Sequence, residues 1–308
     1  MTVICAILVD SKETTTFRQS LLSLQKQTRR PEHTLLYTER QLSPEEEAQL
    51  KRDFAAIGLC LCHRNAASGY REGFDTAFRS LNADYVWILD TDTEAAPDAL
   101  QQILDRPDAP GTIRTGLLKA AVRGDELSHP LAVESAENLF SPWKNHLKTS
   151  DLPPAPEIPV RGAWLGALYP RAAWKKIGSP TADTFLQNNN DEYPWKARRA
   201  DFRFSVIPAA VLYHPSFAAE LIHFKIGGRS FFYEIGLPPA LQYYKIRNWA
   251  WILRLRHPKK PHIRLALCGC YIILALNAML KSGELQPRRV YNLFRALHNG
   301  FYGKLRPF

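Results

Sequence analysis

The sequence predicts an α/β fold, because short apolar runs alternate with segments of helical periodicity over its first 215 residues. Runs of strand character lie at residues 3–9, 34–37 and 58–63, and helical segments separate them. Strands that alternate with helices form parallel sheets covered on both faces, so we expect a Rossmann-like architecture.

Each element has its own signal. Residues 3–9 form a continuous apolar run, typical of a buried strand, and the spacing of Phe17, Leu21 and Leu24 predicts a helix over 16–28. We expect further helices over 44–59, 70–81 and 193–200, and strands over 34–37, 58–63, 85–89, 161–170 and 202–213.

The composition is that of a folded globular protein. Of the 308 residues, 45% are hydrophobic and 23% are charged, which excludes wholesale disorder. The five cysteines form no zinc-binding pattern, and both Cys-x-Cys pairs lie in apolar runs, where free cysteine packs as a small hydrophobe. We therefore expect a reducing, cytoplasmic setting, and we interpret the apolar N-terminus as a first strand rather than a signal peptide.

Charge divides the chain into two parts. Residues 225–308 carry 15 Lys or Arg and only two acids, Glu234 and Glu284, for a net charge of +13. The whole chain has a formal charge of +10, which leaves −3 for residues 1–224. We therefore expect one domain over 1–224 and a basic, mostly helical C-terminal segment over 225–308.

The basic segment contains a largely apolar run of 16 residues, 265–280, that Asn277 interrupts. This length is short for a membrane span, which needs about 20 residues. The run is either a buried core helix or a segment that lies in the cytoplasmic leaflet, anchored by upstream cations and by Trp249 and Trp251. Because cations and aromatic side chains occur together here, an anionic membrane surface is a better partner than nucleic acid, which we do not expect to bind.

The most informative motif is Asp90-Thr91-Asp92, which follows the apolar run 85–89. Side chains alternate along a strand, so Asp90 and Asp92 leave its end on the same side and Thr91 points away. Two carboxylates in this position are costly unless a cation lies between them, and hard divalent ions take oxygen ligands that they share with phosphates. The alternative is a surface turn, in which Asp is common.

Other motifs accompany this pair in a recognisable order. They are the first strand, Asn65-x-x-x-Gly69-x-x-x-Gly73, Asp90-x-Asp92, the acids Asp191 and Glu192, and a terminal His214. This order resembles the inverting GT-A glycosyltransferases of family 2, and within them the bacterial rhamnosyltransferases and galactofuranosyltransferases. The resemblance covers roughly residues 1–215 and implies a Rossmann-like GT-A nucleotide-diphospho-sugar transferase domain with a mostly helical C-terminal appendage.

The resemblance also implies a role for most of these residues. Asp90 and Asp92 would hold Mg²⁺ or Mn²⁺ against the diphosphate of a nucleotide-sugar, and His214 would be a third metal ligand. The residues on the donor side would be Asp10, Glu39, Asn65, Gly69 and Asp90.

The catalytic base is where the sequence departs from the family pattern. With Glu192 in the family register, Asn189 and Asn190 stand where two acids normally stand, and an amide cannot accept the acceptor's proton. The base is then Asp191, which we favour, or Glu192. The alternative is that both acids only stabilise the N-terminus of a helix, where negative charge is favourable. Trp164 would form the wall of the acceptor site or belong to the core.

Together these residues predict a metal-dependent inverting glycosyltransferase. It would move a hexosyl, deoxyhexosyl or galactofuranosyl group from a UDP-, dTDP- or GDP-linked donor to a glycan or lipid-linked acceptor, in bacterial cell-surface polysaccharide synthesis. We expect it on the inner face of the cytoplasmic membrane. Two alternatives stay open: a sugar-nucleotide-binding protein that has lost catalysis, as Asn189 and Asn190 suggest, and a nucleic-acid-binding protein, which leaves Asp90 and Asp92 unexplained.

Overall fold

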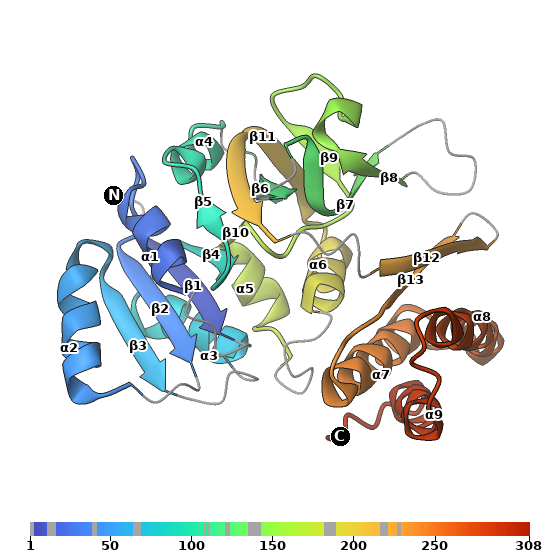
Figure 1. Cartoon of the computed structure of the whole chain (residues 1–308). Coiled ribbons are helices and arrows are strands. Elements are labelled where there is room, and N and C mark those ends of the chain that lie inside the picture. The colour runs from blue at the N-terminus through green and yellow to red at the C-terminus, as the bar shows by residue number, and fades with distance from the viewer. Residues whose placement is uncertain are drawn as a thin grey trace. The chain divides into compact units, whose positions relative to one another are not determined.

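The computed structural model describes residues 3–10, 17–38, 42–63, 69–107, 109, 111–120, 124–134, 143–181, 189–215, 221–226 and 229–308. The chain forms two compact units. Unit 1 consists of Met1–Ala182 and Asn189–Ser216, and unit 2 of Asp183–Asn188 and Phe217–Phe308 (Figure 1).

Unit 1 is built on a large sheet whose first half is parallel. The strand order is β3-β2-β1-β4, and each neighbouring pair runs in the same direction. The bounds are β1 Ile4–Asp10, β2 His33–Thr38, β3 Leu59–His63 and β4 Tyr85–Asp90. The four N-terminal strands predicted from apolar runs are therefore confirmed to within one residue at each end.

One face of this half is covered by α1 (Phe17–Gln25), α2 (Pro44–Asp53) and α4 (Ala99–Leu104). Their buried apolar side chains share a core with alternate residues of β1, such as Ile4 and Leu8, which are fully buried. A strand buried on both faces needs apolar residues at every position, which explains the unbroken run in the sequence.

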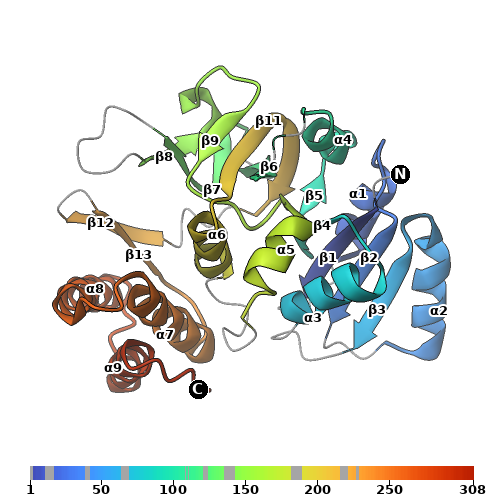
Figure 2. The same cartoon turned by 180° about the vertical axis from the view of Figure 1, so that it is seen from behind.

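The opposite face is covered by α3 (Gly69–Asp75), seen in front of the sheet in Figure 2. Two glycines let this helix approach the strands closely. A Cβ at Gly73 would lie 2.8 Å from Cδ1 of Ile7, and one at Gly69 would lie 3.0 Å from Cβ of Tyr37. Close packing of a helix on a sheet therefore accounts for the glycine spacing of the Asn65–Gly73 motif.

Helix α2 begins and ends at clear local signals. Ser43 caps its N-terminus in a capping box with Glu46. The helix ends at Asp53, earlier than the predicted 59, because a 3₁₀ turn over Ala55–Ile57 leads to Gly58 at φ +54°. Only glycine adopts this conformation readily, and a Cβ there would lie 2.2 Å from the carbonyl oxygen of Glu32.

The second half of the sheet is mixed, so the expectation of a parallel sheet is right for the first half only. β10 inserts antiparallel between β4 and β6, and β6 runs parallel to β11. β4 and β6 run in the same direction, and the connection between them contains α4. β10 lies between these two strands and runs in the opposite direction. The bounds of these strands are β5 Glu94–Ala95, β6 Thr112–Ala120, β7 Glu126–Glu134, β8 Trp143–Lys148, β9 Ile158–Val160, β10 Ala167–Pro170 and β11 Arg203–His214. Unit 1 also contains the helices α5 Arg171–Ile177 and α6 Asn189–Arg199.

Unit 2 is mostly helical, as predicted for the C-terminal segment. A hairpin of β12 (Leu221–Ile226) and β13 (Arg229–Glu234) precedes α7 (Pro239–Arg256), α8 (Pro261–Lys281) and α9 (Pro287–Phe301). Each helix starts with proline, whose missing N–H is not needed in the first turn. The three helices share an apolar core, and α7 and α9 approach so closely that a Cβ at Gly300 would lie 2.1 Å from the carbonyl oxygen of Arg247.

Candidate active site

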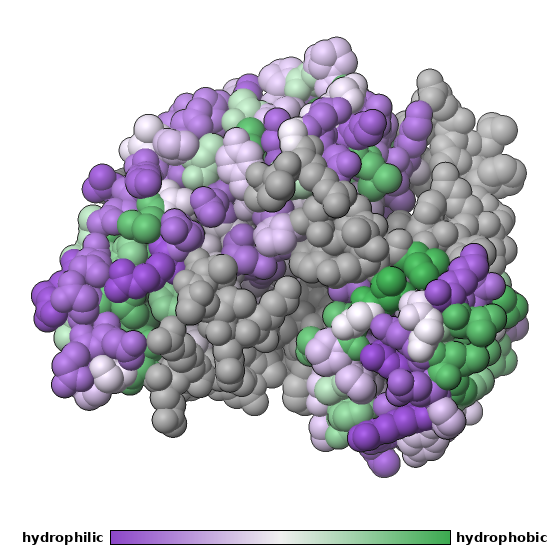
Figure 3. Space-filling model, in the orientation of Figure 1, coloured by the Kyte–Doolittle hydropathy of each residue, from purple (hydrophilic) through white to green (hydrophobic). Residues whose placement is uncertain are grey.

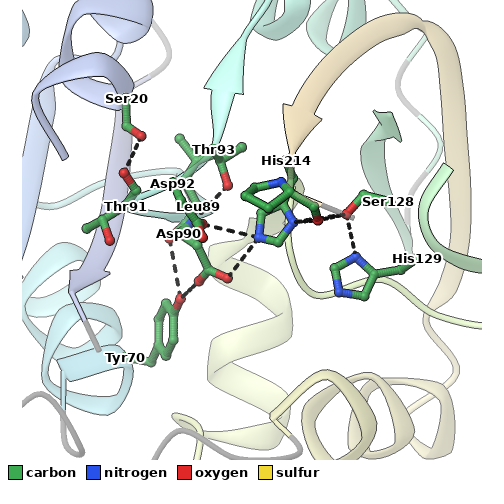
Figure 4. A network of polar contacts seen from close by, with 11 residues as sticks. Ser20, Tyr70, Leu89, Asp90, Thr91, Asp92, Thr93, Ser128, His129 and His214 are labelled. Carbon is green, nitrogen blue, oxygen red and sulfur yellow. Dashed lines mark hydrogen bonds and ion pairs between the residues drawn. The ribbon is translucent and has the colours of Figure 1, made fainter. Parts of the chain in front are cut away.

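The two acids of the Asp90-x-Asp92 motif lie on a tight turn at the end of β4. The N–H of Thr93 donates to the carbonyl oxygen of Asp90 at 3.1 Å, which closes the turn. Thr91 is buried, and its carbonyl oxygen accepts a hydrogen bond from the hydroxyl of Ser20 at 2.7 Å (Figure 4). The turn therefore fixes the backbone of the motif and leaves both carboxylates facing the same space.

His214 reaches this turn through strand pairing. Residues 94–95 of β5 pair antiparallel with Leu212 and Tyr213, so the last residue of β11 lies beside the acids. Nε2 of His214 is 3.2 Å from Oδ1 of Asp92 and 3.8 Å from Oδ2 of Asp90. The structure thus brings together the three residues predicted as metal ligands, with one ligand atom of each within 4.8 Å of the others.

Hydrogen bonds from neighbouring residues fix the side chains of His214 and Asp90. Oγ of Ser128, on β7, lies 2.9 Å from Nδ1 of His214 and donates to the carbonyl oxygen of Pro215. On the other side, the hydroxyl of Tyr70 donates to Oδ1 of Asp90. Burial, and then the charge of Asp90, raises the pKa of Tyr70 well above its usual value, so the phenol keeps the proton that it donates.

The electrostatics of the cluster favour a cation. Burial lowers the pKa of His214, but hydrogen bonds and charges from Asp90 and Asp92 outweigh it and raise the pKa to about 9. Without a metal, the ring is therefore protonated at neutral pH and balances part of the charge of the two acids. Two carboxylates and an imidazole are also a suitable donor set for a divalent metal ion, so the three residues could hold one.

The two candidate bases lie in the first turn of α6 but in different surroundings. Glu192 is fully buried, accepts a hydrogen bond from Oγ1 of Thr181 at 2.8 Å and forms an ion pair with Lys196. Asp191 is only partly buried. A buried, paired carboxylate is poorly placed to receive a proton from an acceptor, and the role of Asp191 as the base stays a prediction.

With this geometry in view, the chain was compared with known proteins. Residues 7–131 match the sequence model of the family described as glycosyl transferase family 2. This part of the chain is a family 2 glycosyltransferase domain. The match spans β1 to β7 and therefore includes Asp90, Asp92 and Ser128. No curated protein sequence matches the chain.

Solved structures show the GT-A fold of this family 2 domain. The GalNAc-T7 structure with UDP, GalNAc and Mn²⁺ aligns with a TM-score of 0.55 at 14% identity, over 82% of this chain and 48% of that one. The structure of S. aureus TarS 1-349 in complex with UDP-GlcNAc aligns with the same TM-score and identity. That alignment covers 97% of this chain and 80% of the TarS chain. The chain thus spans about half the length of the GalNAc-T7 chain. At 14% identity, these two likenesses show the fold alone.

The donor residues predicted for the family 2 domain are described only in part. Asp10 ends β1, whose Val9 pairs with Asp90, so its backbone lies at the same sheet edge as the acids. Its side chain, and the whole of Glu39 and Asn65, lie outside the described residues. Gly69 is buried and packs against Tyr37 and Val9, which explains a glycine there. Donor binding by Gly69 stays a prediction.

Trp164 lies in an aromatic cluster of unit 1. Its ring is only 7% exposed and contacts Tyr70, Phe74 and Tyr193, with centroids 5.0 to 6.1 Å apart. Most of this indole therefore contacts the core, and a role as the wall of the acceptor site stays a prediction. Asn189 and Asn190 begin α6, and their side chains lie outside the described residues.

Two residues that contact the Asp90–Asp92–His214 cluster, Tyr70 and Ser128, were not predicted from the sequence. Tyr70 directly follows Gly69 in the glycine motif, and that position next to a predicted binding loop was an available signal. Ser128 had none, because a serine in a strand of mixed character is chemically silent until the fold places it behind His214.

Proposed function

We propose that this protein is a metal-dependent inverting glycosyltransferase that moves a sugar from a nucleoside-diphosphate donor to a hydroxyl group of a glycan or lipid-linked acceptor. The observation that carries the proposal is the convergence of Asp90, Asp92 and His214 at the carboxyl-end edge of a GT-A sheet. Ligands of open α/β sheets bind at this edge. The biological setting that fits best is the synthesis of bacterial cell-surface polysaccharide.

The donor side rests on the three metal ligands. Asp90, Asp92 and His214 would hold the ion, which, when bound, offsets the charge that develops on the leaving diphosphate. Tyr70 keeps Asp90 oriented, and Ser128 keeps His214 oriented. Because one ligand is an imidazole, and Mg²⁺ prefers oxygen ligands, we expect Mn²⁺ to support higher activity than Mg²⁺. UDP-linked sugars are the first donors to test, since GalNAc-T7 and TarS were solved with UDP and UDP-GlcNAc.

The acceptor side rests on Asp191. In a single in-line displacement, this carboxylate would take the proton of the acceptor hydroxyl as its oxygen attacks the anomeric carbon, and the configuration at that carbon would invert. Glu192 would hold the start of α6 through Thr181 and Lys196 rather than exchange protons with substrate.

A donor screen tests the proposal directly. Thermal shift with UDP-, dTDP- and GDP-sugars, with and without Mn²⁺, identifies the donor, because a ligand that binds only the folded state raises the midpoint. Release of nucleoside diphosphate from that donor, and its loss in excess EDTA, would establish the metal-dependent transfer. Undiminished release in EDTA would remove the metal from the mechanism.

A matched pair of variants localises the activity. Asp92→Asn should lower donor turnover by at least about 100-fold, because it removes one anionic ligand from the cluster. Asp201→Asn makes the same chemical change on a side chain that is 92% exposed, at φ +65°, a conformation that asparagine tolerates. Equal turnover in the two variants would show that the Asp90–Asp92–His214 cluster has no part in catalysis.

The second candidate is a sugar-nucleotide-binding protein that has lost catalysis. It is favoured by the amides Asn189 and Asn190, which stand where the family has acids. A metal-dependent thermal shift with a donor, without release of nucleoside diphosphate in the presence of a range of glycan acceptors, would decide for this candidate.

A further inference from the structure

Helix α8 of unit 2 has one buried face and one exposed face. The buried face packs in the core shared by α7, α8 and α9, and includes Tyr271, Ala275 and Ala278 at helical spacing. The exposed face carries Leu265, Ile273 and Leu280, which are 60%, 69% and 66% exposed. These are large apolar side chains in a position where a water-facing helix normally carries charge.

Apolar residues make up most of the exposed face along the length of α8. At the helical repeat, one stripe of α8 contains His262, Leu265, Ala266, Gly269, Ile273, Leu276, Asn277 and Leu280. The stripe contains no Lys, Arg, Asp or Glu, and its polar members are His262 and Asn277. Figure 3 shows hydrophobic residues gathered over this helix, beside the hydrophilic residues of the rest of unit 2. A largely apolar surface of this kind is typical of a site of protein or membrane contact.

Cations stand at both ends of the stripe. Lys259 and Lys260 precede α8, Lys281 ends it, and all three are exposed. They belong to the segment 225–308, whose net charge is +13. Two copies of such a segment repel each other, whereas an anionic surface attracts it. Charge therefore favours a negatively charged lipid surface over a second copy of this chain.

We infer that α8 lies in the plane of an anionic membrane, with the face of Leu265, Ile273 and Leu280 in the boundary between head groups and acyl chains. Lys259, Lys260 and Lys281 then lie at the level of the lipid phosphates. The inference does not depend on the proposed function, because it concerns the surface of unit 2 alone.

The packing of α8 favours this orientation over a membrane span. Among the described residues, α8 is the one helix long and apolar enough to cross a bilayer, and 33% of its most apolar stretch is buried. The residues that bury it belong to α7, to α9 and to the β12–β13 hairpin. Of these elements, α7 and α9 carry Arg247, Arg254, Arg288, Arg289 and Arg295. A spanning α8 would bring these arginines into the hydrocarbon, where each is strongly unfavourable.

Co-sedimentation of the full chain with vesicles tests the inference. The chain should pellet with phosphatidylcholine vesicles that contain phosphatidylglycerol, and less with phosphatidylcholine alone. Combined Leu265→Ser, Ile273→Ser and Leu280→Ser should lower the partition coefficient at least about tenfold, since three apolar side chains lose their burial in lipid. Combined Lys259→Gln, Lys260→Gln and Lys281→Gln should abolish the preference for phosphatidylglycerol.

A matched control distinguishes binding through this face from non-specific binding of exposed apolar side chains to lipid. Leu265→Ser should weaken binding, whereas Leu147→Ser, which removes a leucine that is 54% exposed on β8 of unit 1, should not. Circular dichroism and the unfolding midpoint of each variant confirm that the fold is intact.

Three results would overturn the inference. Recovery of the intact chain in the supernatant with both kinds of vesicle would show that the face does not bind lipid. Concentration-dependent dimerisation in sedimentation velocity, lost in the triple serine variant, would assign the face to a second copy. Retention of the chain in the pellet after alkaline carbonate extraction would assign α8 to a span. None of these measurements uses donor turnover, so they leave the proposed function separately testable.

Discussion

The hydroxyl oxygen of Ser128 lies 2.9 Å from Nδ1 of His214, on the side of the ring that faces away from Asp90 and Asp92 (Figure 4). The same Nδ1 lies 2.8 Å from the carbonyl oxygen of Pro215. A carbonyl only accepts, so this network assigns a hydrogen to Nδ1. When the ring is neutral, the lone pair on Nε2 then points at the two acids, which is the tautomer that a metal ligand needs.

Ser128→Ala should therefore weaken metal binding. Without the hydroxyl, the ring of His214 keeps its bond to Pro215 but loses the second contact that fixes its orientation. Loss of such an outer contact typically lowers metal affinity about 10- to 100-fold. We expect a fall of about tenfold in Mn²⁺ affinity by calorimetry, with turnover largely restored at saturating Mn²⁺.

Ser205→Ala is the matched control for this prediction. Ser205 is also a buried strand serine, and it lies nine residues before His214 on β11, where its hydroxyl bonds to Glu157. It should leave Mn²⁺ affinity unchanged. Equal losses in the two variants would mean that any buried serine change disturbs the sheet, and that Ser128 has no specific role.

The stability of the metal-free protein should depend on the protonation of His214. Its pKa is raised from 6.5 to about 9 in the folded state. A raised pKa stabilises the fold fully below pH 6.5, and this contribution disappears as the pH rises through about 9. The loss amounts to on the order of 3 kcal/mol of unfolding free energy. Urea unfolding of EDTA-treated protein between pH 6 and 10 measures it.

Two comparisons identify the titrating group. His214→Asn should flatten the decline between pH 6.5 and 9, whereas His262→Asn, at an exposed position of α8, should leave it intact. Saturating Mn²⁺ should also flatten it, because a metal-bound ring stays neutral. An unchanged slope in His214→Asn would show that other groups cause the decline.

The first half of the sheet could be predicted from sequence because its signals are local. The runs 3–9 and 85–89 are buried on both faces, so every residue is apolar and the pattern is unmistakable. Strands β6 to β9 were missed, because their sequences show no regular alternation of apolar and polar residues. In addition, β6 and β9 pair with β11, which lies far along the chain. Such strands are defined by tertiary pairing rather than by propensity.

The candidate site divides in the same way. The acids of the Asp90-x-Asp92 motif are two positions apart in the sequence, and His214 was predicted from the family resemblance. The contact itself depends on the pairing of β5 with β11, two residues against two, which no local pattern reveals. Ser128 joins the cluster only because β7 lies behind His214. Helix packing on β1 and β2 explains Gly73, and it also explains Gly69, for which donor binding stays a prediction.

This packing leads to a prediction for Gly73→Ala. The added methyl group would lie 2.8 Å from Cδ1 and 3.0 Å from Cγ2 of Ile7, in a fully buried contact between α3 and β1. Overpacking of this kind costs about 1–3 kcal/mol of unfolding free energy. Gly269→Ala is the control, since a Cβ there meets nothing within 4 Å and alanine favours a helix interior. Urea unfolding should show a loss for the first variant and none for the second.

Asp191 and Glu192 offer the sharpest test of the chemistry, because adjacent residues are expected to fail in different ways. Asp191→Asn should lower kcat by about 10², the usual contribution of a general base, with little change in donor KM or in the unfolding midpoint.

Glu192→Gln should instead destabilise the fold by on the order of 1–3 kcal/mol, because it breaks the ion pair to Lys196 and alters a fully buried group bonded to Thr181. Its kcat should stay close to normal at temperatures where the variant is folded. Steady-state kinetics and thermal unfolding of both variants, measured side by side, separate the two roles. If Glu192→Gln loses turnover at an unchanged midpoint while Asp191→Asn remains active, Glu192 is the base and the family register holds. If both variants keep normal turnover and a normal unfolding midpoint, the base lies elsewhere in the chain.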